Sequence, residues 1–282
     1  MDNYDQRHQE LVLPVVRINA KNAVGSGTVI CSRLNTQEGY STYILTNEHV
    51  VDGLITVETR WSTLLKREIK MDVLGIPTVE FFEYRWASRS VGAFGVEADI
   101  MAYDKDEDLA LLKLRRDKQA EAEAKLYPRG HEAELRVTMP VYCVGAGMGE
   151  PPVITEGMLS QFNREIDNRE FWLNTGPSIF GNSGGGLFLA NTHEFIGVPS
   201  RIAVQGGFYG SQAITHLSYA IPITRVWKFL EDQRFRFIEQ PNKFTEVGEE
   251  TERQRLRDRE ERRMLGEETP ASLPPIDSAD ES

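Results

Sequence analysis

The sequence has few of the residues that build covalently or metal-stabilised folds. It contains only two cysteines in 282 residues, which excludes a disulfide framework. Cys31 and Cys143 each lie in a short apolar run, VICS and VYCVG, and this favours buried free thiols over a disulfide bridge or a reactive thiol. No cysteine or histidine cluster has the spacing of a zinc site. We therefore expect neither a metal nor a cofactor.

The chain also lacks the usual features of membrane and nucleic-acid-binding proteins. No window approaches the roughly 18 consecutive apolar residues that a membrane helix requires. The N-terminal segment MDNYDQRHQELVLPVVRIN has no basic region followed by an apolar one, as a signal peptide would. The net charge is −11, and no basic patch interrupts the body of the chain. We therefore expect no membrane or nucleic-acid partner. The default location is cytoplasmic, with export or packaging into a virion as alternatives.

Short strand-like segments dominate the first 220 residues. Segments such as STYILTN, LALLKL and TMPVYCVGA have strand length and are rich in Val, Ile, Leu and aromatic residues, while Gly, Asn, Asp and Pro separate them. Many short strands joined by turns indicate a barrel or a sandwich. Residues 116–134 are charged, rich in alanine and without alternation. They predict a surface connector between two β units.

After the strands, the hydrophobic period changes to that of a helix. Val226, Phe229 and Leu230, with Trp227 beside them, predict a helix over 223–237 that packs on the β-rich body. From residue 241 charged residues dominate, and pairs such as Glu249 with Arg253 and Asp258 with Arg262 have i,i+4 spacing. This pattern indicates a solvated helix, with self-association or partner binding as the alternative. The last residues, up to 282, have the composition of a disordered tail.

The segment FGNSGGGLF, residues 180–188, sets one hydroxyl, that of Ser183, among four glycines. An ordinary turn between strands is one interpretation, and a backbone shaped around a nucleophile is the other. A serine hydroxyl is a poor nucleophile unless a base removes its proton. Of the five histidines, His49 is the one that follows an apolar strand, in YILTNEHVVDG. Its imidazole can accept and return a proton near neutral pH, so His49 is the candidate base.

An imidazole base needs a carboxylate that fixes its tautomer and stabilises the imidazolium that forms. Asp108 stands directly before the apolar run LALLKL, which would bury its surroundings. Burial beside a histidine favours a carboxylate that stays ionised and paired. Asp104, Asp106 and Glu107 lie in a charged turn, where solvated roles are expected instead. Asp108 is therefore the candidate acid.

Four motifs occur in the order GSGTVI, LTNEHVV, DLALLKL and GNSGGGL. Together they resemble the trypsin-like serine proteases of chymotrypsin fold, most closely the HtrA/Deg-type branch, over about residues 15–230. The resemblance implies an all-β protease domain over 1–240, built from two six-stranded β-barrels at about 11–115 and 135–222. A C-terminal helix and a charged tail over 241–282 follow. We expect no PDZ domain after Leu230, although HtrA-type proteins usually carry one.

The resemblance also implies roles for individual residues. His49 would be the general base and acid, Asp108 its orienting carboxylate and Ser183 the nucleophile of a serine endopeptidase that forms an acyl-enzyme. The backbone N–H groups of Gly181 and Ser183 would form the oxyanion hole. Asn182 is neutral where digestive members have an Asp that pairs with a newly cut N-terminus, so we expect no activation by cleavage. The alternative function is a catalytically silent binding or scaffold module.

The same resemblance locates a substrate pocket. Pro177 and Ser178 match the base of the primary specificity pocket, and Val198 and Ser200 are expected in its far wall. No acid lies among these residues, so we expect a small or medium uncharged side chain rather than Lys or Arg. Arg201 is either a surface arginine or a group that favours acidic substrates. The expected partners are protein or peptide substrates.

Residues 62–97 form a longer segment than this branch normally has between its histidine and its aspartate. The segment VEFFEYRW within it predicts an extra hairpin that buries Phe81, Phe82, Tyr84 and Trp86 against the first barrel. The alternative is a flap or contact surface over the cleft.

Overall fold

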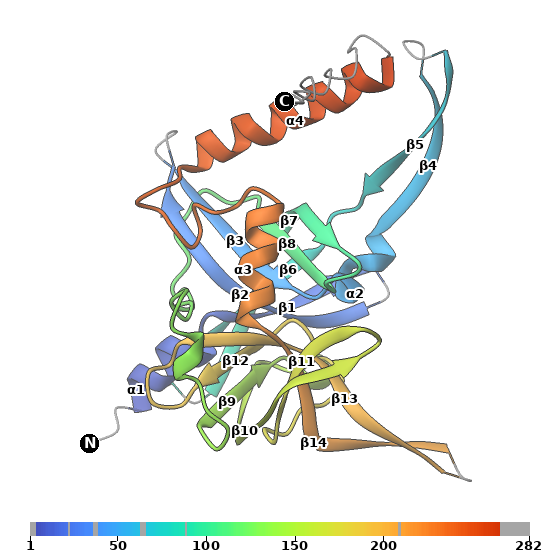
Figure 1. Cartoon of the computed structure of the whole chain (residues 1–282). Coiled ribbons are helices and arrows are strands. Elements are labelled where there is room, and N and C mark those ends of the chain that lie inside the picture. Colours follow the sequence, from blue (N-terminus) through green and yellow to red (C-terminus); the bar gives the residue numbers. More distant parts are fainter. Residues whose placement is uncertain are drawn as a thin grey trace, which may run out of the picture.

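Two closed, antiparallel, six-stranded barrels form the body of the protein (Figure 1). The computed structural model describes residues 4–21, 23–35, 39–62, 66–87, 89–207 and 210–265. In order around it, the first barrel contains β1 (Val15–Ala20), β2 (Ala23–Leu34), β3 (Tyr40–Thr46), β8 (Leu109–Leu114), β7 (Arg89–Asp104) and β6 (Thr78–Arg85). The second contains β10 (Val153–Ile166), β11 (Arg169–Asn174), β14 (Gly210–Pro222), β13 (Phe195–Gly207), β12 (Gly186–Leu189) and β9 (Pro140–Gly145). The predicted fold class is confirmed.

Alternating residues of the first barrel divide between two hydrophobic cores. On β3, Ile44 belongs to the cluster inside the barrel, while Tyr43 and Leu45 belong to a larger cluster shared with the second barrel. On β8, Leu112 belongs to the inner cluster and Leu111 to the shared one. Because both faces of these strands are buried, their sequences are nearly continuous apolar runs rather than alternating ones.

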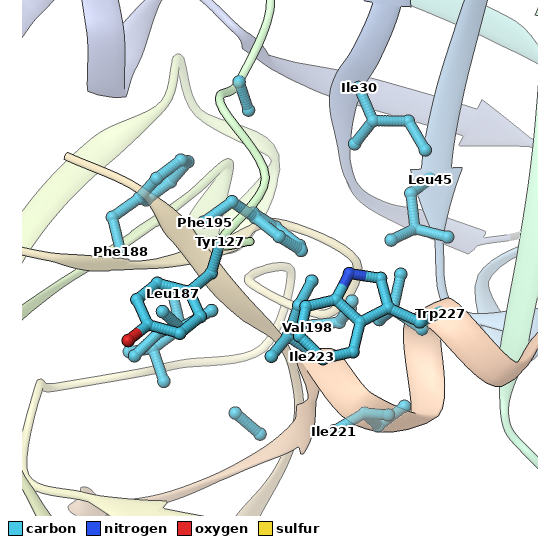
Figure 2. Close-up of a cluster of buried hydrophobic side chains, with 14 of the residues drawn as sticks. Ile30, Leu45, Tyr127, Leu187, Phe188, Phe195, Val198, Ile221, Ile223 and Trp227 are labelled. Atoms are coloured by element: carbon cyan, nitrogen blue, oxygen red, sulfur yellow. The ribbon is translucent and has the colours of Figure 1, made fainter. Parts of the chain in front are cut away.

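The shared core holds the two barrels together around α3 (Ile223–Asp232). Figure 2 shows Trp227 of α3 between Leu45 of the first barrel and Val198 of the second, and each of the three is at most 2% exposed. The helix is shorter than the predicted range of 223–237. It ends where Arg234 adopts a left-handed φ of 60°, a termination that no glycine signals in the sequence.

The connector between the barrels is bonded to both of them. The Ala124 N–H donates to the carbonyl oxygen of Val29 in the first barrel at 2.8 Å. The Tyr127 N–H donates to that of Phe195 in the second at 3.0 Å, and the Tyr127 side chain is only 6% exposed. The segment is therefore more than the predicted surface connector, because Ala124 and Tyr127 bond it to the two barrels.

The extra hairpin lies earlier in the chain than we predicted. It consists of β4 (Ile55–Ser62) and β5 (Arg67–Leu74), which form a separate two-stranded sheet. Figure 1 shows it extending from the first barrel, away from the second. The segment VEFFEYRW contributes instead to β6, a strand of the barrel itself. Phe82 is buried there, but Trp86 is 82% exposed, so the predicted burial of all four aromatic residues is wrong.

The remaining helices include α4 (Glu246–Leu265), which lies along the first barrel (Figure 1). The carboxylate of Glu246 accepts hydrogen bonds from the Tyr43 hydroxyl and the Lys113 ammonium, both at 2.7 Å. Its first turns are thus docked on the protein rather than solvated, and the exposed part begins after Arg253. The predicted disordered tail, 269–282, lies outside the described residues. Shorter helical segments are α1 (Tyr4–Arg7), α2 (Glu48–Val51) and turns at His8–Val12, Asp52–Leu54, Glu132–Glu134 and Gly147–Gly149.

Within the described ranges, no helix has both the length and the apolar character needed to cross a membrane.

The ion pair between Glu249 and Arg236 provides a test of this docking. Glu249 is 3% exposed and pairs with Arg236 at 2.6 Å, not with Arg253 as its spacing suggests. We expect Glu249→Ala to lower the free energy of unfolding by about 1–3 kcal/mol, because it leaves a partly buried guanidinium without its acceptor. Glu250→Ala, at an exposed neighbouring position, should change it by less than about 0.5 kcal/mol. Urea denaturation measures both, and equal effects would contradict the docking.

Candidate active site

The carboxylate of Asp108 lies against the imidazole of His49 at one end of the first barrel. His49 belongs to α2, directly after β3, and Asp108 stands in the turn before β8. The His49 Nδ1 atom is 2.8 Å from Asp108 Oδ1 and 3.1 Å from Oδ2. Asp108 has a left-handed φ of 54°, which is uncommon for a residue with a side chain, and the buried Asn47 amide donates to its carbonyl oxygen at 2.9 Å. The two predicted residues are therefore paired, and their backbones are fixed to each other.

The environment of this pair favours an ionised carboxylate at neutral pH. The Asp108 side chain is 10% exposed and accepts a further hydrogen bond from the Ser200 hydroxyl at 2.6 Å. Burial by itself raises the pKa of Asp108. The hydrogen bond and charge of His49, with the Ser200 hydrogen bond, lower it by more, so the net pKa lies below its usual range. Burial lowers the pKa of His49, but the hydrogen bond and charge of Asp108, together with the charges of Asp52 and Glu48, outweigh this and leave the pKa above its ordinary value of 6.5.

Ser183 lies in the loop between β11 and β12, which bends sharply at two glycines. Gly181 and Gly184 have φ values of 100° and 85°, a region that favours glycine. A Cβ atom on Gly184 would lie 2.2 Å from the Ser26 carbonyl oxygen, and one on Gly181 would lie 2.6 Å from that of Ala146. The glycines around Ser183 are therefore required by both backbone conformation and close packing.

Ser183 and His49 line the same cavity, which has a volume of about 400 Å³. The Ser183 hydroxyl donates to the Ser200 carbonyl oxygen at 3.4 Å, and within the described residues no hydrogen bond joins it to His49. Rotation about χ1 can turn this hydroxyl toward His49. Hydrogen bonds between catalytic residues are often long before substrate binds and shorten in the complex. A larger cavity of about 770 Å³, lined by residues from 123–130 and 238–243, contains none of the predicted site residues.

The carbonyl groups of residues 180–183 all accept hydrogen bonds from the folded chain. The donors are Met148 N–H for Phe180 (2.7 Å), Ser26 Oγ–H for Gly181 (2.6 Å), Gly185 N–H for Asn182 (3.0 Å) and Ser26 N–H for Ser183 (2.8 Å). The C=O and N–H of a trans peptide point in opposite directions, so the Gly181 N–H points away from Met148. In the described part of the chain, no acceptor is bonded to the N–H groups of Gly181 and Ser183. Both donors remain available to a ligand.

Ser26 of β2 connects the first barrel to this loop, a role that we did not predict. Besides its two bonds to the loop, its fully buried hydroxyl accepts from the Ala146 N–H at 2.7 Å. Its carbonyl oxygen accepts from the Thr46 hydroxyl, just before the His49 helix, at 2.7 Å. The motif GSGTVI contains Ser26, but its partners in the second barrel are 120 and 155 residues away in sequence. No local pattern reveals such contacts.

Two of the four predicted pocket residues line the cavity, and two do not. Ser178 and Ser200 contribute to its wall, whereas Pro177 is exposed outside it and Val198 is fully buried in the shared core. A bulge in β13 between Pro199 and Arg201 interrupts the alternation, which separates the environments of Val198 and Ser200. Further wall residues that we did not assign are Ile179, Phe180, Asn182, Pro199, Ile202, Val204 and Ser218.

Other charged residues near the site have structural partners. Arg201 lines the cavity, but its guanidinium pairs with Asp167 at 2.6 Å. The Asp104 carboxylate accepts backbone N–H bonds within its own turn, and Glu107 pairs with Arg225 at 2.6 Å. Glu48 and Asp52 also act on His49 through their charges, but Asp108 is the carboxylate that is hydrogen-bonded to its imidazole.

The two cysteines are free and buried, as we predicted. Burial raises the pKa of the Cys31 thiol to about 12, which disfavours a reactive thiolate. Among the described residues, no group of three or more His, Cys, Asp or Glu side chains is placed to hold a metal ion.

Several known proteases are similar to this chain in sequence. A probable periplasmic DegP-like serine endoprotease of Pseudomonas savastanoi pv. phaseolicola is 30% identical over 71% of this chain and 33% of its own length. A protein of the same description from Hahella chejuensis is 28% identical over 71% and 33%. This chain thus spans about a third of the length of these curated relatives.

Solved structures show the same fold. The HtrA-type protease AlgW with a tripeptide has a TM-score of 0.59 and 20% identity, over 85% of this chain and 65% of that one. Deg5 has a TM-score of 0.56 and 23% identity, over 84% and 97%.

These relatives correct the expected location. The DegP-like relatives are described as periplasmic, and this contradicts the expectation of a cytoplasmic protein. That expectation rested on the absence of a recognisable signal peptide, a feature separate from the fold and the site.

The trypsin-like peptidase domain matches residues 25–198, a range that includes His49, Asp108 and Ser183. This range is more than half of the chain, and the two barrels and the HtrA/Deg relatives agree with it. The family and these relatives support a serine-type endopeptidase. The chain therefore belongs to the family of trypsin-like peptidase domains, as its four motifs predicted.

Proposed function

We propose that this chain is a serine endopeptidase in which Ser183 attacks the peptide carbonyl, His49 transfers the protons and Asp108 orients His49. The observation that carries the proposal is the 2.8 Å contact between His49 and Asp108 beside the cavity that Ser183 lines. A pair of this kind converts a weakly nucleophilic hydroxyl into an effective one. Membership of the peptidase family supports the same function.

In the first step, Ser183 Oγ bonds to the carbonyl carbon of the scissile peptide while His49 Nε2 accepts the hydroxyl proton. The electrons of the C=O π bond move to the oxygen, which becomes negatively charged. The N–H groups of Gly181 and Ser183 donate to this oxygen, and each such donor contributes about 3 kcal/mol in the transition state. Asp108 stabilises the imidazolium, since it is ionised and only 2.8 Å from Nδ1.

The tetrahedral intermediate then collapses to an acyl-enzyme. The C–N bond breaks, and His49 gives its proton to the leaving nitrogen, so the C-terminal fragment departs as a neutral amine. A water molecule next attacks the ester carbon while His49 accepts its proton. The second intermediate releases the N-terminal fragment as an acid, and His49 returns the proton to Ser183. One water molecule is consumed for each peptide bond cleaved.

The cavity beside Ser183 suits a small or medium uncharged side chain of the substrate. Ile179, Ile202 and Val204 give it apolar walls, and its volume of about 400 Å³ is modest. Arg201 also lines the cavity, but the Asp167 carboxylate already neutralises its guanidinium. Protein or peptide substrates with such a residue before the scissile bond are therefore the proposed class.

A fluorophosphonate probe tests the nucleophile directly. We expect intact mass spectrometry to show one adduct on the wild-type protein and none on Ser183→Ala, because only an activated serine reacts with this probe. Peptide hydrolysis should fall by several orders of magnitude in the same variant. If folded wild-type protein forms no adduct, the chain is instead a protease-like binding module.

The pH dependence of kcat/KM tests the role of His49. The base must be neutral, so activity should rise with pH and level off above the raised pKa of His49, with a midpoint above 6.5. Asp108→Asn removes the charge that raises this pKa, so the midpoint should move down and the plateau should fall by about 10⁴-fold. Asp106→Asn, at a side chain that is 97% exposed, is the matched control and should leave both unchanged. A profile that is flat from pH 5 to 8 would contradict the role of His49.

The cross-barrel role of Ser26 predicts a defect in transition-state stabilisation. Ser26→Ala removes the donor to the Gly181 carbonyl and the acceptor of the Ala146 N–H, so the loop can rotate its N–H groups out of position. We expect kcat to fall by about 10- to 100-fold, with KM little changed.

Affinity for a peptide aldehyde, which forms the tetrahedral oxyanion, should fall in parallel with kcat in Ser26→Ala. Thr28→Val is the matched control, because this buried hydroxyl on the same strand has no hydrogen-bond partner among the described residues. It should keep wild-type kcat and aldehyde affinity. A loss of stability in Ser26→Ala without any loss of aldehyde affinity would reduce Ser26 to a structural residue.

A further inference from the structure

The hairpin of β4 and β5 is a two-stranded sheet of its own that extends from the first barrel (Figure 1). Among the described residues neither strand pairs with any other, so each has one free edge of unpaired N–H and C=O groups. Proteins commonly block such an edge with lysine, proline or a β-bulge. The sequence of β4, ITVETRWS, contains neither residue, and its pairing with β5 has no bulge. The edge of β4 is therefore open to another strand.

The two faces of β4 differ in chemistry. Val57 and Trp61 lie on one face and are 61% and 63% exposed. Glu58 and Arg60 lie on the other face, where they form an exposed ion pair at 2.8 Å. A two-stranded hairpin is only marginally stable by itself in water, and an additional strand would cover part of this exposed apolar surface. The hairpin therefore gains stability from a partner strand.

The sequence of β4 is complementary to an antiparallel copy of itself. When two β4 strands align about a twofold axis at Thr59, Glu58 of each strand lies opposite Arg60 of the other. Val57 of each strand then lies opposite Trp61 of the other, on the second face. The twofold axis generates each pair twice. Opposite charges and aromatic residues beside β-branched ones are the cross-strand pairs that stabilise an antiparallel sheet.

Neighbouring registers lack this complementarity. An axis at Glu58 would place that carboxylate opposite its own copy, and an axis at Arg60 would do the same with the guanidinium. An axis between Glu58 and Thr59 would place Val57 opposite Arg60. Like charges directly opposite each other destabilise a sheet, so the charges select the register about Thr59.

The edge of β4 suits such pairing better than the edge of β5. In β5 an antiparallel copy about Met71 would also bring opposite charges together, Lys70 with Asp72. The Asp72 carboxylate, however, already accepts a hydrogen bond from the Tyr103 hydroxyl of the first barrel at 2.5 Å. In the described part of the chain, the hydrogen bonds of β4 stay within the hairpin. The edge of β4 can thus pair without the loss of a contact to the barrel.

We propose that two copies of this chain associate through their β4 edges and form a four-stranded antiparallel sheet in the order β5–β4–β4–β5. The same patch serves both copies, as a twofold interface requires. One added strand on each side makes a small interface, so the association is reversible, with a Kd in the micromolar range. The inference goes beyond the proposed function, because the hairpin contains none of the proposed catalytic residues.

Charge reversal on the full chain, followed by sedimentation equilibrium, tests the interface and its register. We expect the average mass of the wild-type protein to rise from one chain toward two as concentration increases. Glu58→Arg and Arg60→Glu each place like charges opposite each other at two positions, so each should weaken association by at least about 10-fold. A 1:1 mixture of the two variants restores opposite charges at both positions and should associate as the wild type does. The double variant Glu58→Arg/Arg60→Glu should do the same.

Lys70→Glu is the matched control, because it reverses an exposed charge on β5 of the same hairpin. It should keep the wild-type association, and circular dichroism checks that every variant is folded. A wild-type protein that stays monomeric at its highest soluble concentration would overturn the proposal. Association that survives both single variants, or that only Lys70→Glu abolishes, would assign it to another surface and overturn it as well. Failure of the mixture to recover would contradict the register about Thr59.

Discussion

The hydrogen bonds of Ser26 are the constraint on which the proposed chemistry depends. His49 and Asp108 belong to the first barrel and Ser183 to the second, so their geometry is only as precise as the contact between the barrels. The core around Trp227 holds the barrels together through the hydrophobic effect, which is strong but not directional. Ser26 adds direction, because its N–H and hydroxyl fix two carbonyl groups of the nucleophile loop. Catalytic groups need placement to within about 0.5 Å, which directional bonds can supply.

The same arrangement explains how a carboxylate can be buried at the site. An isolated buried charge is costly, and burial by itself raises the pKa of Asp108. The imidazole of His49 and the hydroxyl of Ser200 outweigh that cost, each through a hydrogen bond to the carboxylate. Asn47 holds the backbone of Asp108 in its left-handed conformation. In a site of low dielectric these bonds are stronger than in water, so the pair remains ionised and oriented.

The sequence was sufficient for the fold class and for the residues that are marked by local patterns. His49 follows an apolar strand, Asp108 precedes one, and Ser183 lies among glycines with positive φ. Their pairing, like the barrels themselves, needed the resemblance to a known family. The role of Ser26 depends on contacts 120 and 155 residues away, so no local pattern of the sequence indicates it.

The errors in the sequence analysis have identifiable physical causes. The resemblance predicts Val198 and Ser200 in the far wall of the pocket, but the bulge between Pro199 and Arg201 gives these two residues different environments. Pro177 was carried over from the family and lies exposed outside the cavity.

The nucleophile loop packs closely around Asn182. Asn182 is 5% exposed, and a Cβ on Gly147 would lie 2.7 Å from its Oδ1 atom, so the loop packs around a neutral side chain. An aspartate in so buried a place would need a cation, whereas here every carbonyl from 180 to 183 has a donor from within the folded chain. The carbonyl groups beside the Gly181 N–H are thus held by neutral hydrogen bonds. That the protein needs no activation by cleavage stays a prediction.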